Sequence, residues 1–195
     1  MNIGVLGLQG AVVEHMEKLQ QINGVSPIKI KTKQEIESVH ALIIPGGEST
    51  AIGKLMEDFN LMYIIADRIK KGMPVWGTCA GMILMAKKIS NYHRTFLNVM
   101  DIKVKRNAYG SQLDSFRTTL RIPEVSDSEI PLVFIRAPYV EEVWNDVKIL
   151  ARVDDKIVAC RQAHMLATSF HPELTDDMSF HKYFVEQMVI PVLNL

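Results

Sequence analysis

The sequence has few cysteines, no excess of charge of either sign and no long apolar run. Two of its 195 residues are cysteine, and 22 basic residues balance 22 acidic ones. A balanced charge provides no general attraction to nucleic acid or to an anionic membrane, so neither is expected as a partner. No apolar run approaches the roughly 18 residues of a membrane span, and Met1–Val5 does not resemble the start of a secretion signal. We therefore expect Cys79 and Cys160 to be reduced thiols in the cytoplasm.

The length of the chain favours one domain. A chain of 195 residues can bury one sizeable core and is short for two independent ones. The sequence contains no internal repeat, low-complexity segment or linker. We expect a single domain over residues 1–195.

Short apolar segments alternate with helical patterns in the first half of the chain. Near-continuous apolar strands separated by helices indicate a parallel sheet with helices on both faces. Such sheets bind ligands in the loops that follow the strands, where Gln9, Glu48 and Cys79 fall. We expect strands at 2–8, 26–30, 41–44 and 74–77, and helices at 11–22, 33–39, 51–59, 60–70 and 82–89.

Polar side chains mark where several helices begin. Thr32 and Glu35 have the spacing of a capping box, in which each satisfies a backbone N–H near the other. Ser49 or Thr50 is the expected cap of the next helix, and Asn60 is expected to cap the one after it. A last helix is expected after Thr175 as its cap, with an apolar face that includes residues 180, 184 and 188.

The second half of the chain has a more antiparallel pattern. Extended runs at 96–104, 115–122 and 131–135 alternate with polar turns, and Asp154-Asp155 joins the runs 147–153 and 156–161 as a hairpin. Another strand is expected at 165–170. The expected fold is therefore α/β: a three-layer sandwich around a mixed, mainly parallel sheet with an added antiparallel portion.

The segment Gly77-Thr78-Cys79-Ala80-Gly81 predicts a sharp turn between a strand and a helix. Small residues on both sides of a reactive side chain let the backbone bend so that this side chain points off the sheet. At a helix N-terminus a cysteine pKa can fall from about 8.5 to roughly 3.5–7.5, which favours the nucleophilic thiolate. The alternative is that Cys79 is a small buried hydrophobic residue.

His171 is the histidine best placed to serve a nucleophilic thiol. It ends an apolar strand, and Pro172 restricts the backbone so that the side chains of His171 and Glu173 emerge on the same side. Glu173 can then accept the Nδ1–H of His171 while Nε2 faces Cys79. The alternative is a strand-end turn without chemistry. The other histidines mark no site in the sequence, and solvated or structural roles are expected for His15, His40 and His181, while His93 and His164 lie in or near turns.

A glycine-rich loop, Gly46-Gly47-Glu48, supplies the remaining element of acyl transfer. An oxyanion needs preorganised N–H donors, each worth about 2.7–4 kcal/mol in hydrolases. The N–H groups of Gly47 and Ala80 are the candidates for an oxyanion hole, and the glycine pair permits a peptide flip. A phosphate-binding loop is the alternative, but the segment lacks the Walker spacing and its lysine.

Together these segments resemble class I glutamine amidotransferases, with a Cys79–His171–Glu173 triad. More narrowly, they resemble the glutaminase subunit of pyridoxal 5'-phosphate synthase. The motifs that carry the resemblance are Gly7-Leu8-Gln9-Gly10, Pro45-Gly46-Gly47-Glu48-Ser49-Thr50, Arg106-Asn107-Ala108-Tyr109-Gly110, Asp114-Ser115-Phe116, Ile135-Arg136-Ala137-Pro138 and Ser169-Phe170-His171-Pro172-Glu173-Leu174-Thr175. Residues 90–97 and the tail after 187 fit the family pattern poorly, and 161–167 fits it loosely.

The resemblance implies a flavodoxin-like core and a role for each matching residue. Cys79 would attack the side-chain amide carbon of L-glutamine, His171 would protonate the departing ammonia, and Glu173 would orient His171. Water activated by His171 would then release glutamate from the thioester. The residues implied to hold glutamine are Gly47, Glu48, Ser49, Arg106, Ile135 and Arg136.

Charge suggests how glutamine would be oriented. Arg106 or Arg136 could pair with its α-carboxylate, and Glu48 with its α-ammonium, although each charge could instead belong to an ordinary surface group. Gln9 could assist the oxyanion or contact a partner.

The resemblance also implies a protein partner, a (β/α)8 synthase subunit that receives the ammonia. Pyridoxal 5'-phosphate would be the product of the complex, so no cofactor and no metal are expected in this chain. Two alternatives remain from the residues alone: an elbow-cysteine enzyme of the peptidase or glyoxalase kind, and a non-catalytic regulatory module. Cys160 is expected to be a buried thiol without a role in the chemistry.

Overall fold

The computed structural model describes residues 1–90, 92–106 and 115–193. Its main sheet consists of β1 (Asn2–Leu6), β2 (Ser26–Ile30), β3 (Ala41–Ile44), β4 (Val75–Thr78), β5 (Ala86–Ile89), β6 (Met100–Lys105), β9 (Tyr139–Val143), β10 (Lys148–Val153), β11 (Lys156–Gln162) and β12 (Met165–Thr168). A separate hairpin pairs β7 (Ser115–Arg121) with β8 (Glu129–Ile135). The helices are α1 (Val12–Gln20), α2 (Lys33–Ser38), α3 (Ser49–Asp58), α4 (Met62–Lys70), α5 (Ala80–Met85), the 3-10 turn η1 (Pro172–Leu174), α6 (Ser179–Phe184), the π-helical segment η2 (Val185–Val189) and α7 (Ile190–Leu193).

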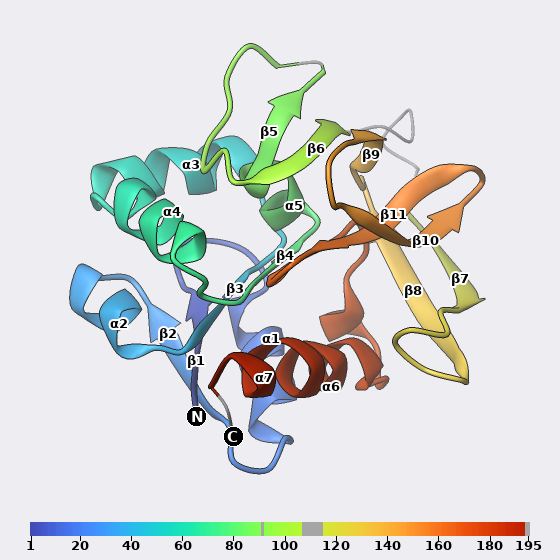
Figure 1. Ribbon diagram of the computed structural model, residues 1–195, viewed down its shortest axis with the longest axis horizontal. Helices are drawn as coiled ribbons and strands as arrows, with labels where there is room; N and C mark the ends of the chain where they lie inside the picture. Colours follow the sequence, from blue (N-terminus) through green and yellow to red (C-terminus); the bar gives the residue numbers. More distant parts are fainter. Residues whose placement is uncertain (91, 107–114, 194–195) are drawn as a thin grey trace.

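The main sheet has a parallel half and a largely antiparallel half. Its strand order is β2-β1-β3-β4-β12-β11-β9-β6-β5, with β10 also paired to β11. The pairs from β2 to β12 are parallel, whereas β11 is antiparallel to β12, β9 and β10 (Figure 1). This arrangement confirms the expected mixed sheet and the antiparallel character of the second half.

Side chains alternate between two apolar clusters on opposite faces of the sheet. In β3, Leu42 and Ile44 belong to one cluster, and Ala41 and Ile43 to the other. The first cluster includes buried residues of α2, α3, α4 and α5, and the second those of α1, α6, η2 and β8. Because a strand points successive side chains to opposite faces, an uninterrupted apolar strand such as Ala41–Ile44 requires cover on both. The resulting layers, visible in Figure 1, confirm the expected sandwich.

The register of β4 and β12 brings two distant segments together. These strands are parallel neighbours, and Thr78 pairs with Thr168. The chain therefore leaves both strands at the same edge of the sheet, first at Cys79 and, much later in the sequence, on the way to His171.

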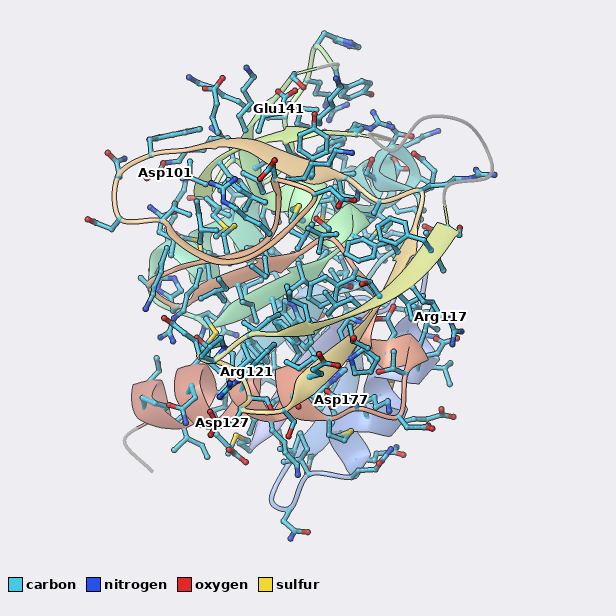
Figure 2. All side chains as sticks on the ribbon, turned by 90° about the vertical axis from the view of Figure 1, so that its right-hand side faces the viewer. Asp101, Arg117, Arg121, Asp127, Glu141 and Asp177 are labelled. Carbon is cyan, nitrogen blue, oxygen red and sulfur yellow. The ribbon has the colours of Figure 1, made fainter. Side chains whose placement is uncertain are left out.

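The antiparallel portion contains a buried carboxylate. Asp101 on β6 accepts hydrogen bonds from Lys87 Nζ at 2.5 Å, Asn145 Nδ2 at 2.8 Å and Gln162 Nε2 at 2.7 Å. In Figure 2 it lies in the upper part of the molecule, whereas Arg121 and Asp127, an exposed ion pair at the tip of the β7–β8 hairpin, lie in the lower part. The Asp101 carboxylate thus joins β6 to β5, to β11 and to the loop after β9.

Two expected helix caps were wrong. The carboxylate of Glu48, not the hydroxyl of Ser49 or Thr50, accepts hydrogen bonds from the backbone N–H groups of Thr50 at 3.2 Å and Ala51 at 2.7 Å, so α3 begins at Ser49. Asn60 has a φ of 55° and ends the turn after α3 instead of capping α4. Asparagine tolerates the left-handed region, which explains its place at a helix C-terminus. The Thr32–Glu35 capping box is confirmed.

Other expected boundaries also differ. The helix expected at 82–89 is the short α5, and residues 86–89 form β5, which pairs with β6. An apolar segment satisfies either pattern, and the pairing with β6 decides it. The helix expected after Thr175 is α6, which begins at Ser179. Asp177 accepts the backbone N–H of Ser179 at 2.8 Å, so Thr175 is not the cap. The expected strands at 2–8, 96–104 and 165–170 are shorter, being β1, β6 and β12.

No helix within residues 1–90, 92–106 and 115–193 has the length and apolar character needed to cross a bilayer.

Candidate active site

Cys79 occupies a strained turn between β4 and α5. Its φ of 49° and ψ of −103° lie outside the regions that non-glycine residues favour. A Cβ on Gly77 would lie 2.5 Å from the backbone carbon of Gly81, and one on Gly81 would lie 2.0 Å from the carbonyl oxygen of Ile44. Both glycines are therefore required by close packing of backbone against backbone, and the predicted elbow is confirmed as a conformation.

The thiol is buried but faces a neighbouring loop. The backbone N–H of Cys79 donates to the carbonyl of Thr168 at 2.8 Å, which ties the turn to β12. Its Sγ lies 3.9 Å from the carbonyl oxygen of Ile135, and 6% of the residue is exposed. The end of β8 thus passes beside the sulfur.

His171 and Glu173 form the pair that the sequence predicts. The Nδ1 of His171 lies 2.7 Å from Oε1 of Glu173, and both residues are buried. Gly46 packs against His171 and Cys79, since a Cβ there would lie 2.3 Å from His171 Cε1 and 3.3 Å from Cys79 Cβ. Burial by itself lowers the pKa of His171, but hydrogen bonds to Cys79 and Glu173 and their negative charges raise it to about 10. The imidazole is therefore built to hold a proton beside the sulfur.

A cavity of about 410 Å³ opens in front of Cys79 and His171. Every predicted site residue except Glu173 lines it, and Glu173 lies behind His171. Ile83 and Pro138 also line it but were not among the predicted site residues. Helical spacing places Ile83 four residues after Cys79, and Pro138 ends a segment that carries the family resemblance, so both had a signal in the sequence. The full lining is Gln9, Gly47, Glu48, Ser49, Cys79, Ala80, Ile83, Arg106, Ile135, Arg136, Pro138 and His171.

Gln9 holds the glycine-rich loop. Its Oε1 accepts the backbone N–H of Glu48 at 2.8 Å, and a Cβ on Gly47 would lie 2.5 Å from the same oxygen. The carbonyl of Gly46 accepts the N–H of Ala11 at 3.0 Å. These contacts fix the present orientation of the Gly46–Gly47 peptide.

Charged groups lie at the mouth of the cavity. Arg106 Nη2 is 3.5 Å from Oε1 of Glu48, and the Arg106 guanidinium lies 4.5 Å from the centre of the Tyr92 ring. Burial raises the pKa of Glu48, but its hydrogen bonds with Thr50 and Ala51 and the charge of Arg106 outweigh this and lower it. Glu48 is thus an ionised carboxylate.

Arg136, the residue that follows β8, also lines the cavity. Its φ is 44°, a left-handed conformation that costs a non-glycine residue about 1–3 kcal/mol. Arg136 and Cys79 are therefore two strained residues that line the same cavity. Strain of this kind is typical of binding and catalytic positions.

Two buried histidines, His15 and His181, lie behind Glu173 and were not among the predicted site residues. His15 and His181 are both 0% exposed, so of the two roles expected for them, solvated or structural, burial excludes the solvated one. His15 Nε2 lies 3.4 Å from Oε2 of Glu173, an acidic neighbour that the sequence did not indicate. The position of His15 between Val12 and Leu19, on the apolar face of α1, was the available signal.

Cys160 is buried on β11, as expected, and burial raises the pKa of its thiol to about 12. Residues 107–110 and Asp114, which belong to two of the motifs noted in the sequence, lie outside the described residues.

The comparisons with known proteins identify the family of the chain. The model of the SNO glutamine amidotransferase family matches residues 5–190. The chain belongs to this family. It is 61% identical over 186 residues, 95% of this chain and 98% of the other, to a protein of Ruminiclostridium cellulolyticum named pyridoxal 5'-phosphate synthase subunit PdxT. A protein of the same name from Thermoanaerobacter sp. is 60% identical over 185 residues, again 95% and 98% of the two chains.

A solved structure shows the same fold at substantial identity. A crystal structure described as glutamine amidotransferase superposes with a TM-score of 0.88 at 41% identity, covering 94% of this chain and 97% of that one. Membership of the SNO glutamine amidotransferase family confirms the predicted enzyme class and fold, and the PdxT relatives confirm the narrower resemblance. The peptidase or glyoxalase alternative is not favoured.

Proposed function

We propose that this SNO-family chain is the glutaminase subunit of a pyridoxal 5'-phosphate synthase and releases ammonia from L-glutamine for a synthase partner. The observation that carries the proposal is the meeting of Cys79, His171 and Glu173 at a cavity lined by the residues expected to hold glutamine. The names of the relatives support the pathway. Residues 1–195 would act as one domain, because both apolar clusters flank one sheet. A cytoplasmic location stays a prediction.

In the proposed reaction, His171 takes the proton of the Cys79 thiol and the thiolate attacks the amide carbon of glutamine. The carbonyl π electrons move to oxygen, and the N–H groups of Ala80 and Gly47 stabilise the oxyanion. When the carbon–nitrogen bond breaks, His171 gives its proton to the nitrogen and ammonia leaves. A water molecule then loses a proton to His171 and attacks the thioester, which releases glutamate and restores the thiol. Glu173 orients His171 throughout.

The charges at the cavity mouth fit an amino acid. Arg106 and Arg136 are the candidates for the α-carboxylate, and Glu48 for the α-ammonium group. Ser49 and the backbone near Ile135 would complete the contacts. Since Glu48 also caps α3, binding of the ammonium would be coupled to the start of this helix.

A docked partner is part of the proposed mechanism. Ammonia released into neutral water becomes ammonium and is no longer a nucleophile, so it must pass directly to a synthase. We expect the isolated subunit to be weakly active because the Gly46–Gly47 peptide is held by the N–H of Ala11. Turning this peptide toward the oxyanion would break one hydrogen bond, a net loss of about 0.5–1.5 kcal/mol that docking could offset. Equal glutaminase rates with and without the synthase would contradict this expectation.

The experiment that tests the function measures glutamate release from glutamine with and without a purified synthase subunit. Wild type, Cys79→Ala and the matched control Cys160→Ala are compared. We expect synthase-stimulated release in wild type and in Cys160→Ala, and its loss in Cys79→Ala. Release retained in Cys79→Ala would refute Cys79 as the nucleophile.

A further inference from the structure

Glu173 lies between two histidines, and only one of them belongs to the proposed triad. Its Oε1 faces Nδ1 of His171 at 2.7 Å, and its Oε2 faces Nε2 of His15 at 3.4 Å. The Oε2 atom is buried and, among the described residues, has no hydrogen bond of normal geometry. A buried carboxylate oxygen without a hydrogen bond is energetically costly. A donor on the nearby His15 would therefore stabilise Oε2 and orient the carboxylate.

The contacts of His15 continue into the protein. Its Nε2 also lies 3.2 Å from Thr78 Oγ1, and its Nδ1 lies 3.0 Å from Nε2 of His181. His181 comes from α6 and His15 from α1, so the pair joins two elements that cover the same face of the sheet. Both histidine rings make T-shaped contacts with Trp76.

Both histidines are neutral. Burial is the main cause that holds the pKa of His15 well below 6.5, and the positive charges that His181 and His171 carry when protonated lower it further. Burial and the charge of Lys18 lower the pKa of His181 to about 3. Each ring therefore has one N–H donor and one acceptor nitrogen, and the contacts decide which is which.

One arrangement of the protons satisfies more groups than the other. If His15 carries its proton on Nε2, this N–H faces both Oε2 of Glu173 and Oγ1 of Thr78. Its Nδ1 then accepts from His181 Nε2–H, and the unpartnered Nδ1 of His181 is an acceptor. In the opposite arrangement a lone pair of His15 would face the carboxylate and His181 would bury an unpaired N–H. Repulsion between acceptors and the greater cost of a buried orphan donor favour the first arrangement.

We propose that His15 is a positioning residue of the active site, which holds the Glu173 carboxylate for His171 by presenting its Nε2–H to Oε2, with His181 fixing the tautomer. The contact at 3.4 Å is long, and hydrogen bonds of an active site often tighten only when the substrate is bound. Because one carboxylate then accepts from two rings, its plane is held and Nδ1–H of His171 keeps one direction. The inference rests on the proposed glutaminase function.

The experiment uses the complex with the synthase subunit and a glutamine-like chloroketone that alkylates Cys79. The measured quantities are the first-order rate constant of alkylation at saturating reagent and the fraction of chains labelled at the end. His15→Leu removes the donor, whereas His15→Gln returns an amide nitrogen near the position of Nε2. His164→Leu is the matched control, because His164 is a partly buried histidine bound to the carbonyl of Ile69.

We expect His15→Leu to lower the rate constant roughly 10- to 100-fold, the range for loss of one hydrogen bond to a charged group, with full labelling at the end. His15→Gln should recover most of this loss, and His164→Leu should react like wild type. A purely structural role would reduce the labelled fraction and leave the rate constant unchanged, which would overturn the proposal. If His15→Leu does not fold, His15→Asn takes its place, because the shorter Asn side chain places its amide near the position of Nδ1 and not near that of Nε2. Equal alkylation rate constants for His15→Asn and His15→Gln would then overturn the proposal.

The same preparations separate this inference from the proposed function. Glutamate release that persists in Cys79→Ala refutes the function itself. Release that is lost in Cys79→Ala, together with a wild-type rate constant in His15→Leu, overturns the role of His15 alone.

Discussion

Gly81 lies directly against the backbone of Ile44, so that α5 crosses the end of β3 without space for a side chain. A Cβ on Gly81 would lie 2.0 Å from the Ile44 carbonyl oxygen. This close crossing sets the direction in which the chain leaves Cys79. The geometry of the nucleophile therefore depends on a glycine that is not among the residues lining the cavity.

Replacing Gly81 with alanine tests this dependence. Overpacking usually costs about 1–3 kcal/mol, and we expect Gly81→Ala to reach or exceed the upper end because the obstructing atoms are backbone. The free energy of unfolding, measured in urea, should fall accordingly. Gly24→Ala is the control: its Cβ would meet no atom within 4 Å, and only its φ of 78° opposes the change. Equal losses in the two variants would contradict the role of the Ile44 contact.

The protonation of His171 should depend on both of its neighbours. Its pKa is raised to about 10 by hydrogen bonds to Cys79 and Glu173 that outweigh burial. We expect Cys79→Ala and Glu173→Gln each to lower this pKa, measured from the imidazole nitrogen resonances of His171 as a function of pH. Cys160→Ala should leave the titration unchanged. An unaltered His171 titration in both variants would show that the contacts do not determine its charge.

The same shift predicts how stability depends on pH. A group whose pKa is higher in the folded than in the unfolded state stabilises the protein fully below its unfolded value, near 6.5 for histidine. That contribution should be lost as the pH rises from about 6.5 through about 10. The difference in unfolding free energy between wild type and His171→Asn should shrink across this interval. A difference that grows with pH would have the wrong sign.

Arg106 should affect the binding of glutamine more than the chemistry. It lines the cavity, and its Nη2 lies 3.5 Å from Oε1 of Glu48, the proposed partner of the α-ammonium group. We expect Arg106→Gln to raise KM for glutamine roughly 10- to 100-fold, the effect of losing one charged hydrogen bond, with a small change in kcat. Arg94→Gln, which breaks an exposed pair with Glu57, is the control. A fall in kcat at constant KM would assign Arg106 a different role.

We expect Asp101 to be the carboxylate that contributes most to the stability of the antiparallel portion. Burial raises its pKa, but hydrogen bonds from Lys87, Asn145 and Gln162 lower it to about 2. The stabilisation is thus present above pH 4, the usual range of an unfolded aspartate, and should be lost as the pH falls through about 2. Asp101→Asn should cost about 2–3 kcal/mol of unfolding free energy at neutral pH.

Asp127→Asn is the matched control for Asp101→Asn. Asp127 pairs with Arg121 at 3.5 Å, but its side chain is 94% exposed. An exposed ion pair contributes about 0–1 kcal/mol, so the free energy of unfolding should barely change. Equal effects of the two substitutions would show that the Asp101 contacts are not stabilising.

Local patterns were the part of this structure that the sequence predicted well. The Thr32–Glu35 capping box joins residues close in the chain, and so does the pairing of His171 with Glu173. The strand Ala41–Ile44 was recognised because an uninterrupted apolar segment between turn residues has few other solutions. In each case the residues involved lie within four positions of one another, so their spacing in the sequence is enough to predict the local structure.

Predictions failed where a distant segment competed with a local preference. The helix expected to continue to residue 89 ends at Met85, because pairing with β6 makes the following residues a strand. Glu48 caps α3 although hydroxyl residues follow it, in a loop where Gln9 and Arg106 also contact it. These residues are visible in the sequence, but their contacts with distant segments could not be predicted from it.

The sequence by itself determined the alternation of strands and helices, the glycine-flanked turn at Cys79 and the adjacency of His171 and Glu173, because these depend on backbone preferences and short spacings. Only the tertiary structure decided that the thiol and imidazole meet, through the parallel register of β4 and β12. It also decided that His15 lies behind Glu173, although 158 positions separate them in the numbering (173 − 15). Such contacts depend on how the sheet brings remote segments to one edge and on which polar groups burial forces into contact.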